Sequence, residues 1–256
     1  MLSKNKLKLI ASLQNGKFRK EHKLFVAEGT KLVTDLNAAG ATIECLVATA
    51  EWLTEFNVNC RETIECSGEE MRKASFLKTP ASVLALVRIP DSGAQIKPTA
   101  DKLILVLDDV QDPGNMGTII RLADWFGIDA LVCSIGTVDC YNPKVIQATM
   151  GAIARVNVQY TQLGGYLGDA AKAGIPVYGT FLEGNPIYTE TLPANGIIVL
   201  GNEGKGIGPE VASLVNKKLL IPDFSQGSTK PESLNVSVAA AIVCSEFRRR
   251  GFFRQA

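Results

Sequence analysis

Polar side chains that could take part in chemistry occur in three segments of the sequence, each of which follows an apolar run. In the first segment, residues 107–127, Asn115 and Arg121 lie in or next to a predicted helix, and Gly117 and Thr118 share the face of Arg121. A single guanidinium on a face of small residues favours a pocket wall, although Asn115 could equally be a helix N-cap and Arg121 a solvated side chain. Since six helical residues turn through about 600°, we expect Asn115 and Arg121 to converge only if Asn115 precedes the helix.

The second segment is a glycine-rich loop, GNEGKG at residues 201–206, which follows an apolar strand. Lys205 is followed by glycine instead of Ser or Thr, and the glycine spacing is not G-x-G-x-x-G, so neither usual phosphate-binding fingerprint is met. Glu203 would also repel a phosphate. The loop therefore suits a ligand that lies against bare backbone, or an acid that orients an arginine, and an ordinary tight turn is the alternative.

In the third segment, residues 219–250, a strand ends at Pro222, a polar stretch follows, and a helix begins near Ser233. Ser233 could be the N-cap of that helix. The run of small apolar residues from Val236 to Val243 predicts a helix packed tightly on a sheet.

Composition excludes several classes of function. His22 is the single histidine, which removes Ser-His-Asp, Cys-His and H-E-x-x-H chemistry unless that residue does everything. The six cysteines form no C-x-x-C pair, so we expect reduced structural thiols and no metal site. No apolar run is long enough to span a membrane, and the basic N-terminus does not resemble a secretory signal. These features predict a soluble, cytoplasmic protein.

The formal net charge of +1 hides an uneven distribution, because Lys and Arg dominate residues 1–23 and 248–254. A basic end on an acidic body suits contact with a polyanion such as RNA, and an equal alternative is that these side chains only solvate helix ends. The side chains expected to bind RNA are Lys4, Lys6, Lys17, Arg19, Lys20 and Lys23.

Two α/β units are expected to position these residues. In the first, apolar runs at 24–27, 43–48 and 83–88 alternate with helical patterns, and a linker follows at 89–102. The second has six candidate strands, at 103–107, 130–134, 155–159, 176–180, 197–201 and 218–222. Helical patterns between them predict a mostly parallel sheet covered on both faces, with ligands at the carboxyl ends of its strands.

Taken together, the order and spacing of three motifs resemble the SpoU (TrmH-type) family of RNA methyltransferases. The motifs are N-x-G-x-x-x-R at 115–121, GNEGKG at 201–206 and IP…ESLNVSVAAA at 221–241. The resemblance covers about residues 103–256, and YNPKVIQATMGAI at 141–153 is similar to a further family segment. NKLKLIASL and LFVAEGTKLV resemble the small substrate-binding domain of many members, which implies an RNA-binding domain at 1–98.

The resemblance implies an α/β knot with a C-terminal trefoil, a homodimer, S-adenosylmethionine as cofactor, and methyl transfer to a ribose 2′-hydroxyl of tRNA or rRNA. The residues that match the family's polar active-site positions are Asn115, Arg121, Glu203, Ser233 and Asn235. The residues that would hold the cofactor are Thr180, Leu200, Gly201, Ile221 and Leu234.

The sequence departs from the family pattern at two places, of which the first, at Gln147, removes a cation that could contact an RNA phosphate. Gln147 stands where many members have an arginine, and the stretch at 223–232 is longer than expected. Because a guanidinium has a pKa above about 12, we expect Arg121 to clamp the ribose or its phosphate and leave proton removal to water or a substrate phosphate.

Two other interpretations remain open. The first is a non-catalytic RNA-binding or ribosome-assembly factor with the same fold, which the intact Asn115, Arg121, Glu203 and Asn235 disfavour. The second is a nucleotide-binding enzyme of the Rossmann type, which the failed phosphate fingerprints disfavour.

Overall fold

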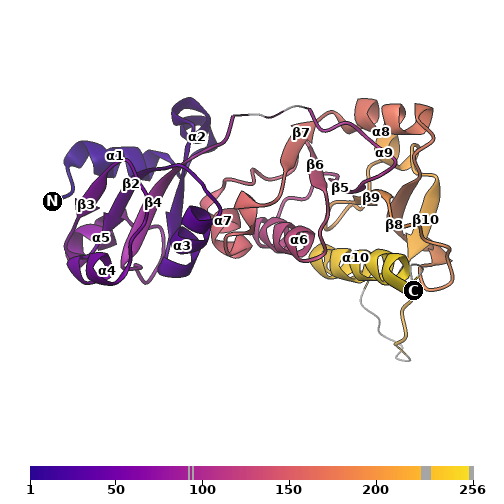
Figure 1. The fold of residues 1–256 in the computed structure, drawn as a ribbon. Coiled ribbons are helices and arrows are strands. Elements are labelled where there is room, and N and C mark those ends of the chain that lie inside the picture. The colour runs from indigo at the N-terminus through magenta and orange to yellow at the C-terminus, as the bar shows by residue number, and fades with distance from the viewer. Residues whose placement is uncertain (92, 94, 226–231, 254–256) are drawn as a thin grey trace. The chain divides into compact units, whose positions relative to one another are not determined.

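The computed structural model describes residues 1–91, 93, 95–225 and 232–253, and the chain forms two compact units (Figure 1). Unit 1 comprises Met1–Gly93 with Asp139–Arg155, and unit 2 comprises Ala94–Val138 with Val156–Ala256. Residues 139–155 lie inside the second predicted domain in sequence, yet they pack as part of unit 1.

Unit 1 contains a four-stranded sheet in the order β1-β4-β2-β3, in which β4 runs antiparallel to both of its neighbours. The strands are β1 (Leu24–Glu28), β2 (Ile43–Ala48), β3 (Thr63–Glu65) and β4 (Val83–Arg88). The helices are α1 (Lys4–Ser12), α2 (Gly16–His22), α3 (Thr30–Ala38), α4 (Ala50–Glu55), α5 (Gly68–Ala74) and α7 (Pro143–Thr149), with a 3-10 turn at Ala152–Ala154.

Segment 139–155 is fastened to the rest of unit 1 by an ion pair. Arg19 Nη2 lies 2.6 Å from Asp139 Oδ2, and Arg19 Nη1 donates to the carbonyl oxygens of Leu13 and Gln14 at 2.8 Å each. The Arg19 side chain is only 3% exposed. The prediction that Arg19 binds RNA is therefore corrected, because its guanidinium is buried and already bonded to protein acceptors.

Unit 2 contains a six-stranded sheet in the order β10-β8-β9-β5-β6-β7. Every neighbouring pair is parallel, which confirms the predicted parallel sheet. The strands are β5 (Leu103–Leu107), β6 (Ala130–Ser134), β7 (Val158–Thr161), β8 (Val177–Pro186), β9 (Gly196–Leu200) and β10 (Lys217–Leu220).

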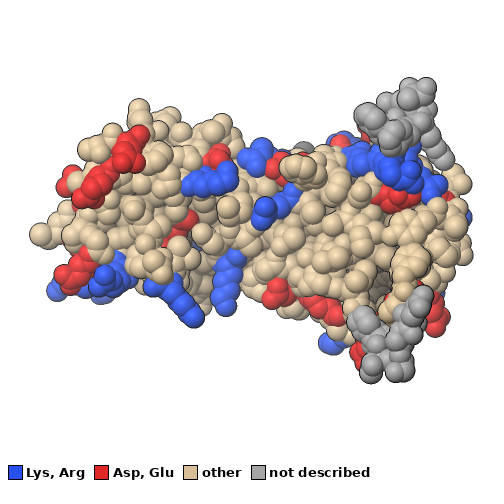
Figure 2. Space-filling model, turned by 90° about the horizontal axis from the view of Figure 1, so that it is seen from below, with Lys and Arg blue, Asp and Glu red and all other residues tan. Residues whose placement is uncertain are grey.

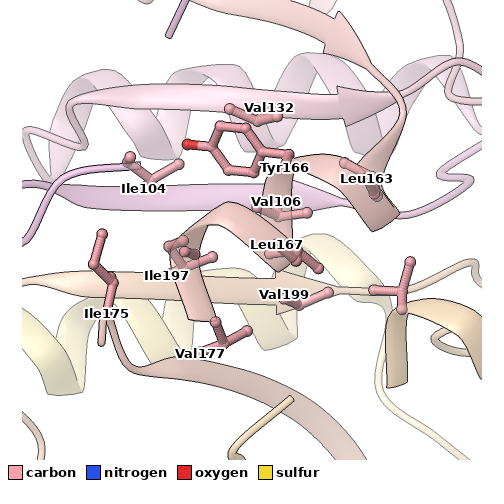
Figure 3. Packing of buried hydrophobic residues seen from close by; sticks show 12 residues of the cluster. Ile104, Val106, Val132, Leu163, Tyr166, Leu167, Ile175, Val177, Ile197 and Val199 are labelled. Atoms are coloured by element: carbon pink, nitrogen blue, oxygen red, sulfur yellow. The ribbon is translucent and has the colours of Figure 1, made fainter. Parts of the chain in front are cut away.

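Helices cover both faces of this sheet, with α8 (Leu163–Lys172) and α9 (Pro209–Ala212) on one side and α6 (Pro113–Trp125) and α10 (Val236–Phe253) on the other (Figure 1). Tyr166 and Leu167 of α8 pack onto Ile104, Val106 and other buried strand residues (Figure 3). Burying each large apolar side chain contributes about 1.5–3 kcal/mol, so this layer makes the sheet a firm base for the loops at its edge. None of the described helices is long and apolar enough to cross a membrane.

The arginines at the end of α10 stabilise the fold. Arg248 Nε donates to the carbonyl oxygen of Phe126 at 2.7 Å, which satisfies a carbonyl at the end of α6. Arg249 and Arg250 both bond to Glu246 Oε1 at 2.7 Å, and these bonds lower the pKa of Glu246 to about 2. Of the two interpretations of this basic end, a role in holding helix ends agrees with these contacts.

Candidate active site

A cleft of about 500 Å³ lies at the carboxyl ends of β8, β9 and β10, where a parallel sheet is expected to bind ligands. Its walls come from the ends of these strands, from the loop after β9 and from the start of α10. The apolar side chains among the lining residues are Phe181, Leu182, Ile207, Leu219, Leu220, Ile221, Leu234, Val236 and Ala239.

Four of the five residues predicted to hold a cofactor border this cleft. They are Thr180, Gly201, Ile221 and Leu234, of which Leu234 is 48% exposed. Leu200 differs, because its side chain is fully buried in the sheet and does not line the cleft. The geometry thus brings together residues that are more than 50 positions apart in the sequence.

The loop at 201–206 is folded by its own backbone and by Asn202. The backbone groups of Asn202 and Gly206 bond to each other in both directions at 2.9 Å, and Asn202 Oδ1 accepts from the amides of Gly204 and Lys205 at 3.0 Å each. A Cβ added to Gly201 would meet the backbone of Gly206 at 2.2 Å. Gly201 is therefore required by the loop itself, whether or not a ligand lies against it.

Three of the predicted polar residues form one hydrogen-bonded cluster. Asn115 Nδ2 donates to Glu203 Oε1 at 3.0 Å, and Asn235 Nδ2 donates to Asn115 Oδ1 at 2.8 Å. Asn235 Oδ1 in turn accepts from the backbone amide of Ser237 at 2.9 Å, in the first turn of α10. The cluster links α6, the loop after β9 and the start of α10.

Glu203 is held as an anion by N–H donors. Its Oε2 accepts from the backbone amide of Gln111 at 3.2 Å, and its Oε1 accepts from the amide of Asp112 at 3.0 Å. Burial alone would raise the pKa of Glu203, but the hydrogen bonds from Asn115 and from these amides outweigh it and lower the pKa below its ordinary value.

Arg121 does not reach this cluster. Asp112 caps α6 by accepting from the amide of Asn115 at 2.8 Å, so Asn115 lies inside the helix and is only 8% exposed. Asn115 is thus not the N-cap, and the condition for Asn115 and Arg121 to converge is not met. Arg121 is exposed on α6, and Ser233 borders the cleft without bonding to the cluster among the described residues.

Comparison with known proteins identifies the family. Residues 102–245 match the SpoU rRNA Methylase family, and residues 4–85 match the MRM3-like substrate binding domain. The chain belongs to the SpoU rRNA methylase family. This confirms the resemblance seen in the sequence motifs.

Relatives of this SpoU-family chain align over almost its whole length. The Bacillus subtilis 23S rRNA (guanosine(2553)-2′-O)-methyltransferase RlmP is 32% identical over 248 residues, which cover 95% of this chain and 96% of RlmP. A TrmH-family structure from Porphyromonas gingivalis is 40% identical with a TM-score of 0.88, covering 98% of this chain and 100% of that one. An AdoMet-bound rRNA methyltransferase from Sinorhizobium meliloti is 27% identical with a TM-score of 0.80, covering 97% and 96%.

The basic side chains expected to bind RNA in this SpoU-family protein fall into two groups. Lys6 and Lys23 are paired with Glu62 at 2.7 Å and with Asp91 at 2.6 Å. Lys4, Lys17 and Lys20 are exposed and make no ion pair in the described part of the chain. On the face drawn in Figure 2, Lys and Arg stand in separate groups with Asp and Glu between them.

Two features singled out in the sequence lie away from the cluster or outside the described part of the chain. Gln147 is half-buried on α7 in unit 1. In the long stretch at 223–232, residues 226–231 lie outside the described residues.

Sequence reasoning missed three residues that hold the loops of this SpoU-family site. Asp108 Oδ2 accepts from the amide of Gly208 at 2.8 Å, Asn202 Nδ2 donates to the carbonyl oxygen of Asp109 at 2.7 Å, and Gln111 bonds to Asp109. A signal was available for Asp108, which directly follows the buried strand β5, and for Asn202, which stands beside Glu203 in the glycine-rich loop. Gln111 had no such signal.

Proposed function

We propose that this protein is an S-adenosylmethionine-dependent methyltransferase that modifies a ribose 2′-hydroxyl of rRNA or tRNA. The observation that carries the proposal is the apolar cleft beside the Asn115–Glu203–Asn235 cluster in a chain of the SpoU family. The B. subtilis relative, aligned over 95% of this chain, is named for 2′-O-methylation of 23S rRNA.

The cleft fits the cofactor. Pockets for ligands of this size measure roughly 300–1,000 Å³ and are lined mainly by apolar groups, as this one is. Ile221 and Leu234 offer apolar contacts, and the loop at 201–206 offers bare backbone for polar ones. The S. meliloti relative has AdoMet bound. When bound, S-adenosylmethionine supplies the methyl group, so the protein has only to align it with the hydroxyl.

The polar cluster orients the reacting groups. Glu203 fixes the Asn115 amide, and Asn115 fixes the Asn235 amide, which keeps one N–H for a ribose or phosphate oxygen. Ser233 lies on the cleft wall two residues before Asn235 and offers a hydroxyl to the substrate. Arg121 clamps the ribose or its phosphate, and the proton leaves to water or to a substrate phosphate.

The homodimer implied by the family resemblance is proposed to form through α6 and α10. Trp125, one turn after Arg121 on α6, is 84% exposed, and Val238 on α10 is 47% exposed. These two side chains lie on helices that pack against each other, and a contiguous apolar patch on such a pair would mark an interaction surface. A partner subunit that covered Trp125 would also bring its surface to Arg121, since residues i and i+4 share a helix face.

The trefoil knot and a cytoplasmic location complete this proposal. The knot is proposed from the membership of the SpoU family, and the C-terminal segment lies against α6, with Asn235 bonded to Asn115 and Arg248 bonded to Phe126. The cytoplasm is where a bacterial rRNA methyltransferase such as the B. subtilis relative meets its substrate.

Unit 1 binds the RNA substrate in this proposal. The lysines proposed to contact its phosphates are Lys4, Lys17 and Lys20. The match of residues 4–85 to the MRM3-like substrate binding domain supports this role.

Mapping 2′-O-methylation in total RNA from cells with and without the gene tests the proposal. We expect one ribose methylation in rRNA or tRNA to disappear with the gene and to return with the intact gene but not with an Arg121→Ala copy. An unchanged methylation map would contradict the proposed activity and favour a non-catalytic RNA-binding factor.

A further inference from the structure

The Gln111 side chain is anchored by both hydrogens of its amide, although it lies at the surface. Gln111 Nε2 donates to Asp109 Oδ1 at 2.6 Å and to the carbonyl oxygen of Gly136 at 2.5 Å. It thereby joins the loop after β5 to the loop after β6. Because the two acceptors belong to different loops, donating both amide hydrogens fixes the Gln111 side chain in one conformation.

Asp109 is held in a conformation that few residues adopt. Its φ of +60° lies in the left-handed region, which costs free energy for a residue with a side chain. Its backbone amide donates to Ser134 Oγ at 2.9 Å, and its carbonyl oxygen accepts from Asn202 Nδ2 at 2.7 Å. These contacts, from the end of β6 and from the loop after β9, direct the Asp109 carboxylate at Gln111.

The backbone of Gln111 leads directly to the polar cluster. Its amide and the amide of Asp112 donate to the two oxygens of Glu203, and Glu203 receives the Asn115 amide. The turn is also held at Val110, which is buried and whose carbonyl oxygen accepts from the amide of Val138 at 2.9 Å. We therefore expect that releasing the Gln111 side chain leaves the turn folded and shifts the two amides relative to Glu203.

We propose that Gln111 is a positioning residue for methyl transfer: its side-chain amide, fixed between Asp109 and Gly136, holds the backbone amides that orient Glu203. Gln111 acts through Glu203 and is not among the residues that line the cleft. The inference rests on the proposed function, and it adds a residue outside the family motifs on which that proposal was based.

Gln111→Glu gives a test that depends on protonation. The new carboxylate faces the carboxylate of Asp109 and the carbonyl oxygen of Gly136. In its ionised form it has no hydrogen to donate to either acceptor, whereas its protonated form donates one hydrogen bond. Two carboxylates that share a site raise the pKa of one of them, so the protonated form is reached at mildly acidic pH. The other charged groups of this turn are Asp112 and Glu203, and the lowered pKa of Glu203 keeps that group ionised in this range.

The measurement is the turnover number for transfer of tritiated methyl from S-adenosylmethionine to rRNA and tRNA purified from cells that lack the gene. At pH 8 we expect Gln111→Glu and Gln111→Leu to lower the turnover number about tenfold, as for loss of one or two hydrogen bonds. The KM for RNA and the Kd for S-adenosylmethionine should stay within about twofold, because a positioning residue outside the cleft affects turnover and not ligand binding.

The pH profile separates positioning from a general loss of structure. Relative to the wild type, the turnover of Gln111→Glu should recover as the pH falls from 8 to 5.5, and that of Gln111→Leu should stay low. The matched control is Gln162→Glu, the same change in charge at an exposed glutamine with no side-chain hydrogen bond in the described part of the chain.

The inference would be overturned if the turnover of Gln111→Glu relative to the wild type stayed as constant with pH as that of Gln111→Leu. It would also be overturned if the two variants kept wild-type turnover at pH 8. An equal loss in Gln162→Glu would also overturn it, because the effect would then be one of charge alone. If the wild-type protein transfers no methyl group to either RNA, the proposed function fails instead, so the two failures are distinguishable.

Discussion

Asn115 Nδ2 donates to Glu203 Oε1 at 3.0 Å and so joins the first turn of α6 to the loop after β9, 88 positions later in the chain. The carboxylate that receives this bond is also bonded to two backbone amides. A side chain satisfied in this way is part of the architecture of the site and not a freely moving acid.

We predict that Glu203→Gln lowers the turnover number at least about tenfold, because an amide has one acceptor oxygen and would point its own N–H groups at the donors around it. Affinity for S-adenosylmethionine should change by a few-fold at most in a calorimetric titration. The matched control is Glu210→Gln, at an exposed glutamate of the same unit that does not border the cleft and has no side-chain hydrogen bond among the described residues. Equal effects of the two variants would mean that the Glu203 network is not needed.

Glu246 predicts how stability depends on pH. Its pKa is lowered to about 2 by Arg249 and Arg250, so its contribution is fully present above the unfolded value of about 4.3 and is lost as the pH falls through about 2. We expect Glu246→Gln to unfold at a lower temperature than the wild type at pH 7, with the difference shrinking below pH 4. Thermal unfolding followed by circular dichroism checks this, and a difference independent of pH would contradict it.

Arg121 is exposed and away from the polar cluster, so its replacement should leave the fold intact. We predict that Arg121→Ala abolishes methyl transfer and leaves cofactor affinity within a few-fold, and that Arg121→Lys also fails, since a point charge does not reproduce a planar fork. Transfer of labelled methyl measures both variants. Activity retained in Arg121→Ala would remove this residue from the mechanism.

The RNA-binding role of unit 1 is better tested by point substitutions than by deletion. Removing residues 1–98 would expose Asp139 and the Tyr141 ring, which lies 5.1 Å from the Phe25 ring. We predict that Lys17→Ala with Lys20→Ala weakens RNA binding. Each lost phosphate contact lowers the slope of log Kd against log salt concentration by about one, so the slope should fall by about two. Filter binding over a range of salt concentrations measures this.

The control for the lysine substitutions is Lys172→Ala with Lys217→Ala, which removes the same charge from exposed positions of unit 2. If both double variants lose RNA affinity equally, the loss depends on the total charge of the protein, and unit 1 is not the RNA-binding unit.

Leu234 offers the cleanest probe of the cleft, because it is half exposed there and fills no core position. We predict that Leu234→Asp lowers affinity for S-adenosylmethionine at least about tenfold, since a carboxylate would have to be desolvated against the ligand. Gly201→Val is unsuitable, because its side chain would clash with the loop backbone. Calorimetry that gave wild-type affinity for a folded Leu234→Asp would place the cofactor elsewhere.

The sequence predicted the strands of unit 2 well where apolar residues run without interruption. LILVL at 103–107 is completely buried, and such a run has few alternatives to a strand covered on both faces. The short strand β3 and helix α2 were missed, because the first has only three residues and the second is polar apart from Phe18. Short elements of this kind form through tertiary contacts that local patterns do not carry.

The candidate site was predictable as a set of residues and less so as a geometry. Asn115, Glu203 and Asn235 meet because parallel strands end at one edge. Because α6 is capped by Asp112, Asn115 lies inside the helix and points in a different direction from Arg121. The burial of Arg19 depends on Asp139, a residue 120 positions away, and no periodicity in the N-terminal segment indicates such a partner.

The central claim is most directly tested by mass spectrometry of the nucleosides released from RNA after incubation with the protein and S-adenosylmethionine that carries a deuterated methyl group. The substrate is rRNA and tRNA from cells that lack the gene, and an Arg121→Ala sample serves as the blank. We predict the deuterated methyl on the ribose of a nucleoside, with its base unmodified. A label on a base, or no label in any nucleoside while the protein binds the cofactor, would contradict the assignment of ribose 2′-O-methylation.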